Sequence, residues 1–406
     1  MPKLSRSPCS SVPRRSLISS DRVIFTEIRF LLLVAVCWAT FFAVPAAFRA
    51  HALAFWGIIF YATYAGEFLL LIGGLVVLTY VFSSRQWVWV PVALLVAVLG
   101  YFKLRAGAPG LAGIIAFPQT SLVLPLGLSF LTFELIHFAL ERRRGKITDA
   151  SLVDLAAFAF FFPCRVAGPI KRYPDFAAGV AKAEISAENL HYGTLRIVVG
   201  LFKKFALADV LALSAARVSS VSSPLHAWGV VLAYSLQIYL DFSAYSDIAI
   251  GLSRLMGIRI PENFRAPYLS SNIQEFWNRW HISLSSWVRD YVFMEVGQPL
   301  FKTRLKSRPR VIAAACYMTT FIVVGAWHGL TPNFLLWGLY HGLLLTAYHL
   351  YKVWIPIAVA RSPLYSSRGA TWAGMGLTFF LVTVGWVLFM VDLPSGFGLL
   401  RLMFRI

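Results

Sequence analysis

The sequence predicts an all-α, polytopic integral membrane protein, and its composition is the first reason. Hydrophobic residues make up 58% of the 406 positions and charged residues only 14%, whereas a soluble globular domain carries about 45–50% apolar and about 25% charged residues. A soluble enzyme of this length could not cover its surface with so few charges. The 33 Phe, 16 Tyr and 13 Trp also exclude a disordered chain.

The distribution of charge is the second reason. Lys and Arg outnumber Asp and Glu by 37 to 18, and the bases stand in short clusters between apolar runs, as in the cytoplasmic loops of a polytopic protein. Nucleic acid is not an expected partner, because no folded basic domain remains to bind it. The four cysteines are scattered without CxxC spacing, so neither disulfides nor a metal site is expected.

Apolar runs of membrane length are the third reason. Residues 1–29 form a basic polar leader, and residues 30–406 are expected to form a single domain. The first run, 30–48, is longer than the apolar region of a signal peptide, so we expect it to be a retained membrane helix. With about 20 residues per span, about ten or eleven segments are expected, at 30–48, 52–82 (two spans broken near Gly66 and Glu67), 87–102, 110–117 (partial), 122–140, 151–163 (short or re-entrant), 191–216, 228–256, 311–330, 334–351 and 371–391.

One polar connection, residues 259–310, is too long to be a simple loop. Its section 275–291 is amphipathic at helical spacing, with one face formed by Phe276, Trp280, Leu284, Trp287 and Tyr291. Two interpretations remain open: an interfacial helix with an aromatic belt, or a segment that enters the protein and lines a cavity. His281 favours the second, because on a helix it would project toward apolar neighbours.

Ionisable residues at membrane depth are functional candidates, because their burial costs free energy. His328 closes an apolar run, with Trp327 beside it and Gly329 after it. A structural histidine would explain this placement, but a proton-transferring one explains it better once His281 is added, since neutral imidazole is the commonest general base near neutral pH. No GxSxG, HExxH or P-loop motif is present.

A second group of candidates lies in the segment 228–256. Asp241 and Tyr245 are four residues apart and share a helix face, whereas Asp247 points elsewhere. The two carboxylates are interpreted either as proton-relay or cation-binding groups of a transporter, or as members of structural ion pairs with Arg254, Arg279 or Arg289. The residues alone leave these alternatives open.

Several motifs, taken together, resemble those of one family. They are Leu-Pro-Leu-Gly-Leu-Ser-Phe at 124–130, Phe-Pro-Cys-Arg-Val-Ala-Gly-Pro-Ile at 162–170, Asp-Phe-Ser-Ala-Tyr-Ser-Asp at 241–247, Pro-Glu-Asn-Phe at 261–264, Glu-Phe-Trp-Asn-Arg-Trp-His-Ile-Ser-Leu-Ser at 275–285, Gly-Ala-Trp-His-Gly at 325–329 and Trp-Gly-Leu-Tyr-His-Gly at 337–342. This series, running in order from about residue 120 to 345, is similar to the bacterial branch of the membrane-bound O-acyltransferases.

The resemblance implies a ring of membrane helices around a tunnel in the inner or plasma membrane. It also implies an acyl thioester that enters from the cytoplasm, and an acceptor hydroxyl that comes from the other side. The family's invariant histidine falls on His328, as general base, and its second conserved polar position on His281, which would position or polarise the donor carbonyl. The remaining tunnel and substrate-binding candidates are Asp241, Tyr245, Asp247, Trp277, Asn278, Arg279, Trp280 and Trp327.

Two subfamilies compete within this branch: one D-alanylates teichoic acids and the other O-acetylates alginate and related polysaccharides. The sequence around 276–294 resembles the D-alanylating type more closely. No bound cofactor is expected, and the thioester donor would be a phosphopantetheine carrier protein or coenzyme A. The other expected partners are an envelope polymer as acceptor, membrane lipids and an extracytoplasmic partner acyltransferase. The alternative hypothesis is a transporter or lipid flippase that uses Asp241 and Asp247.

Overall fold

The computed structural model is entirely helical over the residues it describes, which are 24–83, 86–107, 124–356, 362–363 and 367–405. The first helices are α1 (Ile28–Ala43), α2 (Arg49–Ala65), α3 (Leu69–Phe82), α4 (Trp89–Gly107), α5 (Leu128–Arg143), α6 (Leu152–Ala159) and α7 (Tyr173–Ala181). The middle of the chain forms α8 (Ala187–Phe202), α9 (Asp209–Ala215) and α10 (Pro224–Leu255). The last part forms α11 (Ile273–Arg279), α12 (Ile282–Val288), α13 (Met294–Phe301), α14 (Pro309–His328), α15 (Pro332–Trp354), α17 (Arg368–Met390) and α18 (Leu393–Phe404).

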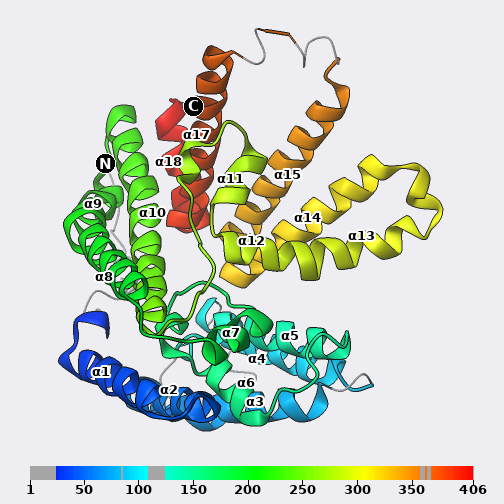
Figure 1. Cartoon of the computed structure of the whole chain (residues 1–406). Helices are drawn as coiled ribbons and strands as arrows, with labels where there is room; N and C mark the ends of the chain where they lie inside the picture. Colours follow the sequence, from blue (N-terminus) through cyan, green and yellow to red (C-terminus); the bar gives the residue numbers. More distant parts are fainter. Residues whose placement is uncertain (1–23, 84–85, 108–123, 357–361, 364–366, 406) are drawn as a thin grey trace, which may run out of the picture.

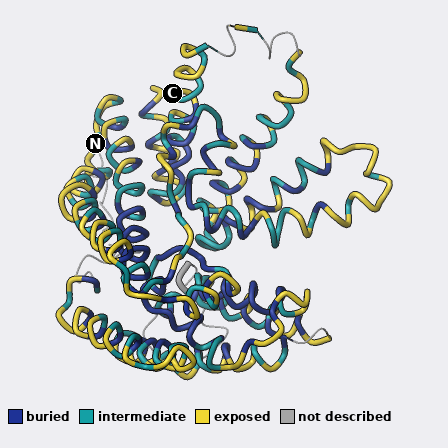
Figure 2. The backbone as a smooth tube through the Cα atoms, in the orientation of Figure 1, coloured by how far each residue is buried: buried dark blue, intermediate teal, exposed yellow. Residues whose placement is uncertain are grey.

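These helices fall into three groups in space (Figure 1). Helices α1 to α7 form the lower layer, α8 to α10 stand at the left, and α11 to α18 form the upper part. The long helix α10 packs against both α8 and α17, so it joins the groups. Helices α13 and α14 run side by side as an arm that projects from the body, and the tip of this arm is exposed (Figure 2).

The predicted membrane character is supported by helix length and by the outer surface. Three segments of the described chain are long and apolar enough to cross a membrane: Ala46–Phe82, Pro309–His328 and Arg368–Met390. Large apolar side chains face outward on several helices, with Leu70 90% exposed and Leu225 84% exposed. Exposed large apolar side chains in this number fit a lipid-facing exterior. The membrane placement of the other expected segments stays a prediction.

Most helix boundaries follow from local signals in the sequence. The break expected near Gly66 and Glu67 is confirmed, because a short 3₁₀ turn, Gly66–Phe68, separates α2 from α3. Helix α10 begins where Ser223 accepts a hydrogen bond from the backbone N–H of His226 at 3.3 Å, with Pro224 at the first helical position. Residues 1–23 of the leader and the whole of the expected segment 110–117 lie outside the described residues, α1 begins at Ile28 within the expected leader, and α18 was not expected.

The expectation of one amphipathic helix over 275–291 is wrong. The chain breaks between α11 and α12 at Trp280 and His281, and His281 has a left-handed backbone conformation with φ 43° and ψ 53°. After α12 the helix widens into a π-helical turn, Arg289–Phe293. Phe276, Trp280 and His281 are buried, which excludes an exposed interfacial helix and fits the alternative in which this segment enters the protein.

Candidate active site

His328 is placed by the close packing of α14 against α15. A Cβ atom on Gly325 would lie 2.4 Å from the carbonyl oxygen of Phe334, and one on Gly338 would lie 2.3 Å from that of Phe321. These glycines therefore allow the two backbones to approach to a distance that any side chain would prevent. Helix α14 ends at His328, because Gly329 takes an extended conformation.

The His328 ring lies in an aromatic environment. Its centroid is 4.6 Å from that of Trp327, 4.8 Å from that of Phe389 and 5.3 Å from that of Trp337, with the last two rings nearly perpendicular to it. Phe334 stacks on it at 6.1 Å. Aromatic walls of this kind exclude water and lower the local dielectric, which strengthens electrostatic interactions with a reacting group.

His281 lies in a second aromatic cage that shares one wall with the first. Its ring centroid is 4.7 Å from that of Phe242 and 6.3 Å from those of both Phe130 and Trp327. The side chain is 2% exposed, and neither ring nitrogen has a hydrogen-bond partner among the described residues. Since the Trp327 ring lies near both His281 and His328, the structure brings the two predicted histidines to the same indole.

Asn263 supports the unusual backbone at His281. Its carbonyl oxygen accepts a hydrogen bond from the N–H of Ile282 at 2.9 Å, and its side-chain Oδ1 accepts one from the Ser283 hydroxyl at 2.6 Å. The Ser283 hydroxyl in turn accepts the N–H of Ile170 at 2.9 Å. Asn263 is fully buried, so it fixes the two residues that follow His281 from a position that solvent does not reach.

A cation also lies at the histidine pair. Lys103, near the end of α4, donates a hydrogen bond from Nζ to the carbonyl oxygen of His328 at 3.1 Å. The same Nζ lies 5.7 Å from the centroid of the Trp327 ring. Within the described part of the chain, no carboxylate forms an ion pair with Lys103.

The three candidates of α10 do not join the histidines. Asp241 pairs with Lys204 at 2.8 Å, and Asp247 pairs with Arg196 and Lys203, each at 2.6 Å. Tyr245 is buried on the Asp241 side of the helix. The structure favours the ion-pair interpretation of both aspartates, although their partners are not the arginines expected.

The two lysines that pair with these aspartates lie in a distortion of the preceding helix, whereas Arg196 lies in α8 itself. Residues Lys203–Ala208 form a π-helical segment between α8 and α9. In this segment Lys203 and Lys204, although adjacent in sequence, reach Asp247 and Asp241 respectively. The expected arginine partners are engaged elsewhere, since Arg254 binds Glu188 and Arg279 binds Glu275.

The four candidates in and around α11 divide by burial. Trp277 contacts Trp337 at 5.9 Å between centroids, and Trp280 contacts Trp386 at 5.0 Å, so both form part of the aromatic core. Asn278 is exposed and Arg279 pairs with Glu275 at 2.5 Å on the same helix. The structure therefore gives no support to Asn278 as a residue that lines a tunnel.

Two further ionisable residues are buried in the described structure. Glu134 binds Arg165 at 2.6 Å and also Lys171, and all three side chains are about 1% exposed. His341 is fully buried, and neither of its ring nitrogens has a hydrogen-bond partner among the described residues.

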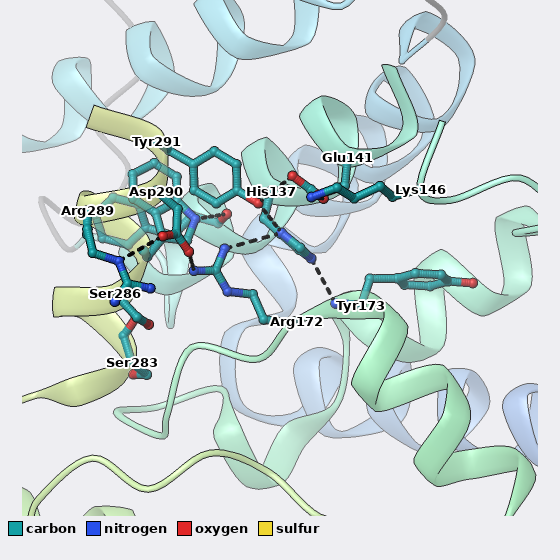
Figure 3. A network of polar contacts seen from close by, with 12 residues as sticks. His137, Glu141, Lys146, Arg172, Tyr173, Ser283, Ser286, Arg289, Asp290 and Tyr291 are labelled. Atoms are coloured by element: carbon teal, nitrogen blue, oxygen red, sulfur yellow. Dashed lines mark hydrogen bonds and ion pairs between the residues drawn. The ribbon is translucent and has the colours of Figure 1, made fainter. Parts of the chain in front are cut away.

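A polar network connects α5 to the segment that follows α12 (Figure 3). His137 accepts the N–H of Tyr173 at Nε2 (2.9 Å), so in its neutral form it carries its proton on Nδ1, which lies 2.7 Å from the Tyr291 hydroxyl. That hydroxyl donates to Glu141 at 3.0 Å. Arg172 lies between the two elements and binds Asp290 at 2.9 Å. This network anchors the helical segment that leads away from His281.

The Glu141 side chain of this network is charged. Burial alone would raise the pKa of Glu141, but hydrogen bonds from Lys146, Arg144 and Tyr291 outweigh it and lower the pKa to about 2. The carboxylate is therefore ionised at neutral pH and holds two bases of the cluster that follows α5.

Comparison with known proteins decides the family. A model described as the membrane-bound O-acyltransferase family matches residues 17–390. The chain belongs to the membrane-bound O-acyltransferase family. It is thus an integral membrane protein, and the resemblance expected from the motifs is confirmed.

Both kinds of bacterial relative are found among the curated members of the family. A probable alginate O-acetylase of Pseudomonas aeruginosa is 35% identical over 356 residues, which cover 82% of this chain and 65% of the relative. A teichoic acid D-alanyltransferase of Bacillus subtilis is 35% identical over 283 residues, covering 67% of this chain and 70% of the relative. A peptidoglycan O-acetyltransferase of Helicobacter pylori is 28% identical over 376 residues, covering 81% and 68%. The chain spans about two thirds of the length of these relatives.

Three of the family motifs of this O-acyltransferase family member contact one another close to His281. Gly127, in the first motif, has φ 69°, and a Cβ there would lie 2.2 Å from the carbonyl oxygen of Arg165 in the second motif. Ile170, at the end of that motif, hydrogen-bonds Ser283, which lies two residues after His281. The motifs are therefore contacting parts of one structure, and not only a series in the sequence.

Sequence reasoning missed Lys103 and the His137 network. Lys103 is a single base after an apolar run, which is what the end of any membrane helix looks like. His137 is buried, and its partners Tyr173 and Tyr291 are far away in sequence. No local spacing signals either feature.

Proposed function

We propose that this protein transfers an acyl group from a cytoplasmic thioester to a hydroxyl of an extracytoplasmic envelope polymer, such as teichoic acid or an exopolysaccharide. The observation that carries the proposal is that His281 and His328 both contact the ring of Trp327 inside aromatic walls. The donor would be a phosphopantetheine carrier protein or coenzyme A. The protein would act as a multi-pass protein of the inner or plasma membrane, with an extracytoplasmic acyltransferase as a further partner.

The chemistry assigned to the pair is acyl transfer with general-base assistance. His328 accepts the proton of the acceptor hydroxyl as its oxygen attacks the thioester carbonyl, a contribution of typically about 10²–10⁴-fold. A new C–O bond forms and the C–S bond breaks, and the proton held by His328 passes to the leaving thiolate. His281, as a neutral imidazole with one N–H, donates a hydrogen bond to the carbonyl oxygen of the donor and polarises it.

The test is the replacement of His328. His328→Ala is expected to abolish ester-linked acylation of the envelope polymer in cells that lack the native gene, while the protein still accumulates in the membrane. His349→Ala is the matched control, because His349 is a half-buried histidine of α15 whose described ring contact is Tyr317. Substantial acylation by a well-expressed His328→Ala protein would exclude this residue from the mechanism.

The transporter alternative receives less support. It required Asp241 and Asp247 as free coupling groups, and both form ion pairs with lysines of the π-helical segment. Transport would be favoured only if neutralising the aspartates abolished activity in a protein of unchanged stability.

A further inference from the structure

The charge at the histidine pair limits which acyl groups it can accept. The rings around His281 and His328 are aromatic, and the base that lies at them is Lys103, whose Nζ hydrogen-bonds the carbonyl oxygen of His328. Across the described residues, no carboxylate contacts either ring. The carboxylates of the neighbouring helices are paired with other bases: Glu134 with Arg165 and Lys171, Asp241 with Lys204, and Glu275 with Arg279.

The two acyl groups that this family's relatives suggest differ in charge. An acetyl group is neutral, whereas a D-alanyl group carries an α-ammonium two bonds from the carbonyl carbon under attack. An ammonium taken into a water-poor site requires a carboxylate or the face of an aromatic ring. The face of Trp327, the ring shared by both histidines, already has the Nζ of Lys103 at 5.7 Å.

We propose that Lys103 is a specificity-determining residue and that the transferred acyl group is neutral, of the acetyl class. This inference rests on the proposed acyl-transfer function. The ammonium of Lys103 is fixed by the carbonyl of His328, so it stays beside the reacting carbonyl and repels a second ammonium there. The repulsion is strong because the aromatic walls keep the effective dielectric low. The same ammonium does not oppose a neutral acyl group, and it favours the oxyanion that forms on the carbonyl.

The experiment separates charge from size with three donors. The purified full chain in nanodiscs is given acetyl-, isobutyryl- and D-alanyl-pantetheine thioesters, because isobutyryl matches D-alanyl in shape with a methyl group in place of the ammonium. Each donor is tested with an alginate oligosaccharide and with a glycerol phosphate oligomer, so that acceptor preference is not mistaken for donor preference. Ester formation that depends on His328 is measured as kcat/KM.

We expect the wild-type protein to use isobutyryl at least about tenfold better than D-alanyl, the size of effect that a nearby like charge produces in a partly buried site. Lys103→Met is expected to reduce this ratio, and Lys103→Arg to preserve it. Lys302→Met, an exposed lysine at the end of α13, should behave as the wild type.

Equal use of isobutyryl and D-alanyl by the wild type, or preferred use of D-alanyl, would overturn the inference without affecting the proposed function. An unchanged ratio in an active Lys103→Met protein would overturn the role of Lys103. If none of the donors gives His328-dependent ester with either acceptor, the proposed function itself fails.

Discussion

At the scale of single residues, the site depends on a histidine whose backbone conformation is imposed from elsewhere. A non-glycine residue with φ 43° is destabilised by about 1–2 kcal/mol relative to the right-handed conformation. Asn263 offsets this by binding Ile282 and Ser283 directly after His281. We therefore treat Asn263 as a positioning residue that acts through His281.

A double-mutant cycle tests this coupling. Asn263→Ala should lower envelope acylation in cells, because the His281 ring would no longer be held against Trp327, while His281→Ala should lower it further but less completely than His328→Ala. If Asn263 acts only through His281, the double variant loses no more activity than His281→Ala alone. Ester content per unit of membrane-inserted protein is the measurement.

The control for this cycle is Asn189→Ala, which removes another buried asparagine, one that bonds the carbonyl of Glu184. Its effect should add to that of His281→Ala, since the two sites are independent. Full additivity between Asn263→Ala and His281→Ala would instead show that Asn263 has only a general structural role.

At the scale of helices, two contacts hold the elements that carry the site. Helices α14 and α15 meet through glycines, and α10 is bound to the π-helical segment Lys203–Ala208 by ion pairs. The first contact sets the position of His328 and Trp337. The second neutralises carboxylates that would otherwise be unpaired inside the membrane.

Gly338→Ala tests the first contact. The added Cβ would lie 2.3 Å from the carbonyl oxygen of Phe321, and overpacking of this kind typically costs about 1–3 kcal/mol. The melting temperature of the purified protein should fall by several degrees. Gly376→Ala in α17, where no heavy atom lies within 4 Å of the added Cβ, should leave it unchanged or raise it slightly, because alanine is favoured over glycine in a helix interior. An equal fall in both variants would contradict the close approach.

Asp241→Asn tests the second contact. Removing one partner of a buried ion pair costs about 3–5 kcal/mol, and Asp209, which also contacts Lys204 at 2.9 Å, should reduce that cost here. The double variant Asp241→Asn/Lys204→Met should recover most of the thermal stability. A single variant with normal stability but no activity would instead identify Asp241 as a functional group.

Local signals predicted much of this architecture but not the break at His281. The interruption at Gly66 was readable because glycine disfavours the helix interior, and the apolar runs located the helices near the histidines. Neither Trp280 nor His281 is a glycine or a proline, so the sequence there carries no helix-breaking signal. The break is stabilised by Asn263, which lies eighteen positions before His281. The partners of Asp241 and Asp247 are 37 and 44 residues away in sequence, so no helical spacing could identify them. The family motifs nevertheless indicated both histidines as candidates, because a family motif reflects contacts between distant segments, whereas helical periodicity reflects only local spacing.

At the scale of the whole molecule, the distribution of charge predicts the orientation in the membrane. The bases Lys302, Arg304, Lys306, Arg308 and Arg310 lie on the exposed arm between α13 and α14. The positive-inside rule places the tip of this arm in the cytoplasm. His328 is at the opposite end of α14, about 27 Å from Arg310 along the helix at roughly 1.5 Å per residue.

Cysteine labelling tests this orientation. In a background without the four native cysteines, Thr331→Cys should react with a membrane-impermeant maleimide in intact cells, and Lys306→Cys should react only after permeabilisation. The reason is that Thr331 follows the end of α14 and Lys306 precedes its start. Labelling of Lys306→Cys in intact cells would reverse the orientation and contradict a site that is reached from both sides.

At His281, the stability of the fold and the proposed activity favour different side chains. Besides the cost of its backbone, it has two buried ring nitrogens without a partner among the described residues, and an unsatisfied buried polar group costs about 1–3 kcal/mol. A phenylalanine at this position would keep the ring contacts and remove the unsatisfied nitrogens. Selection for heat resistance, in the laboratory or in evolution, would therefore favour an inert protein here. The imidazole persists only where its chemistry is under stronger selection than the stability of the fold.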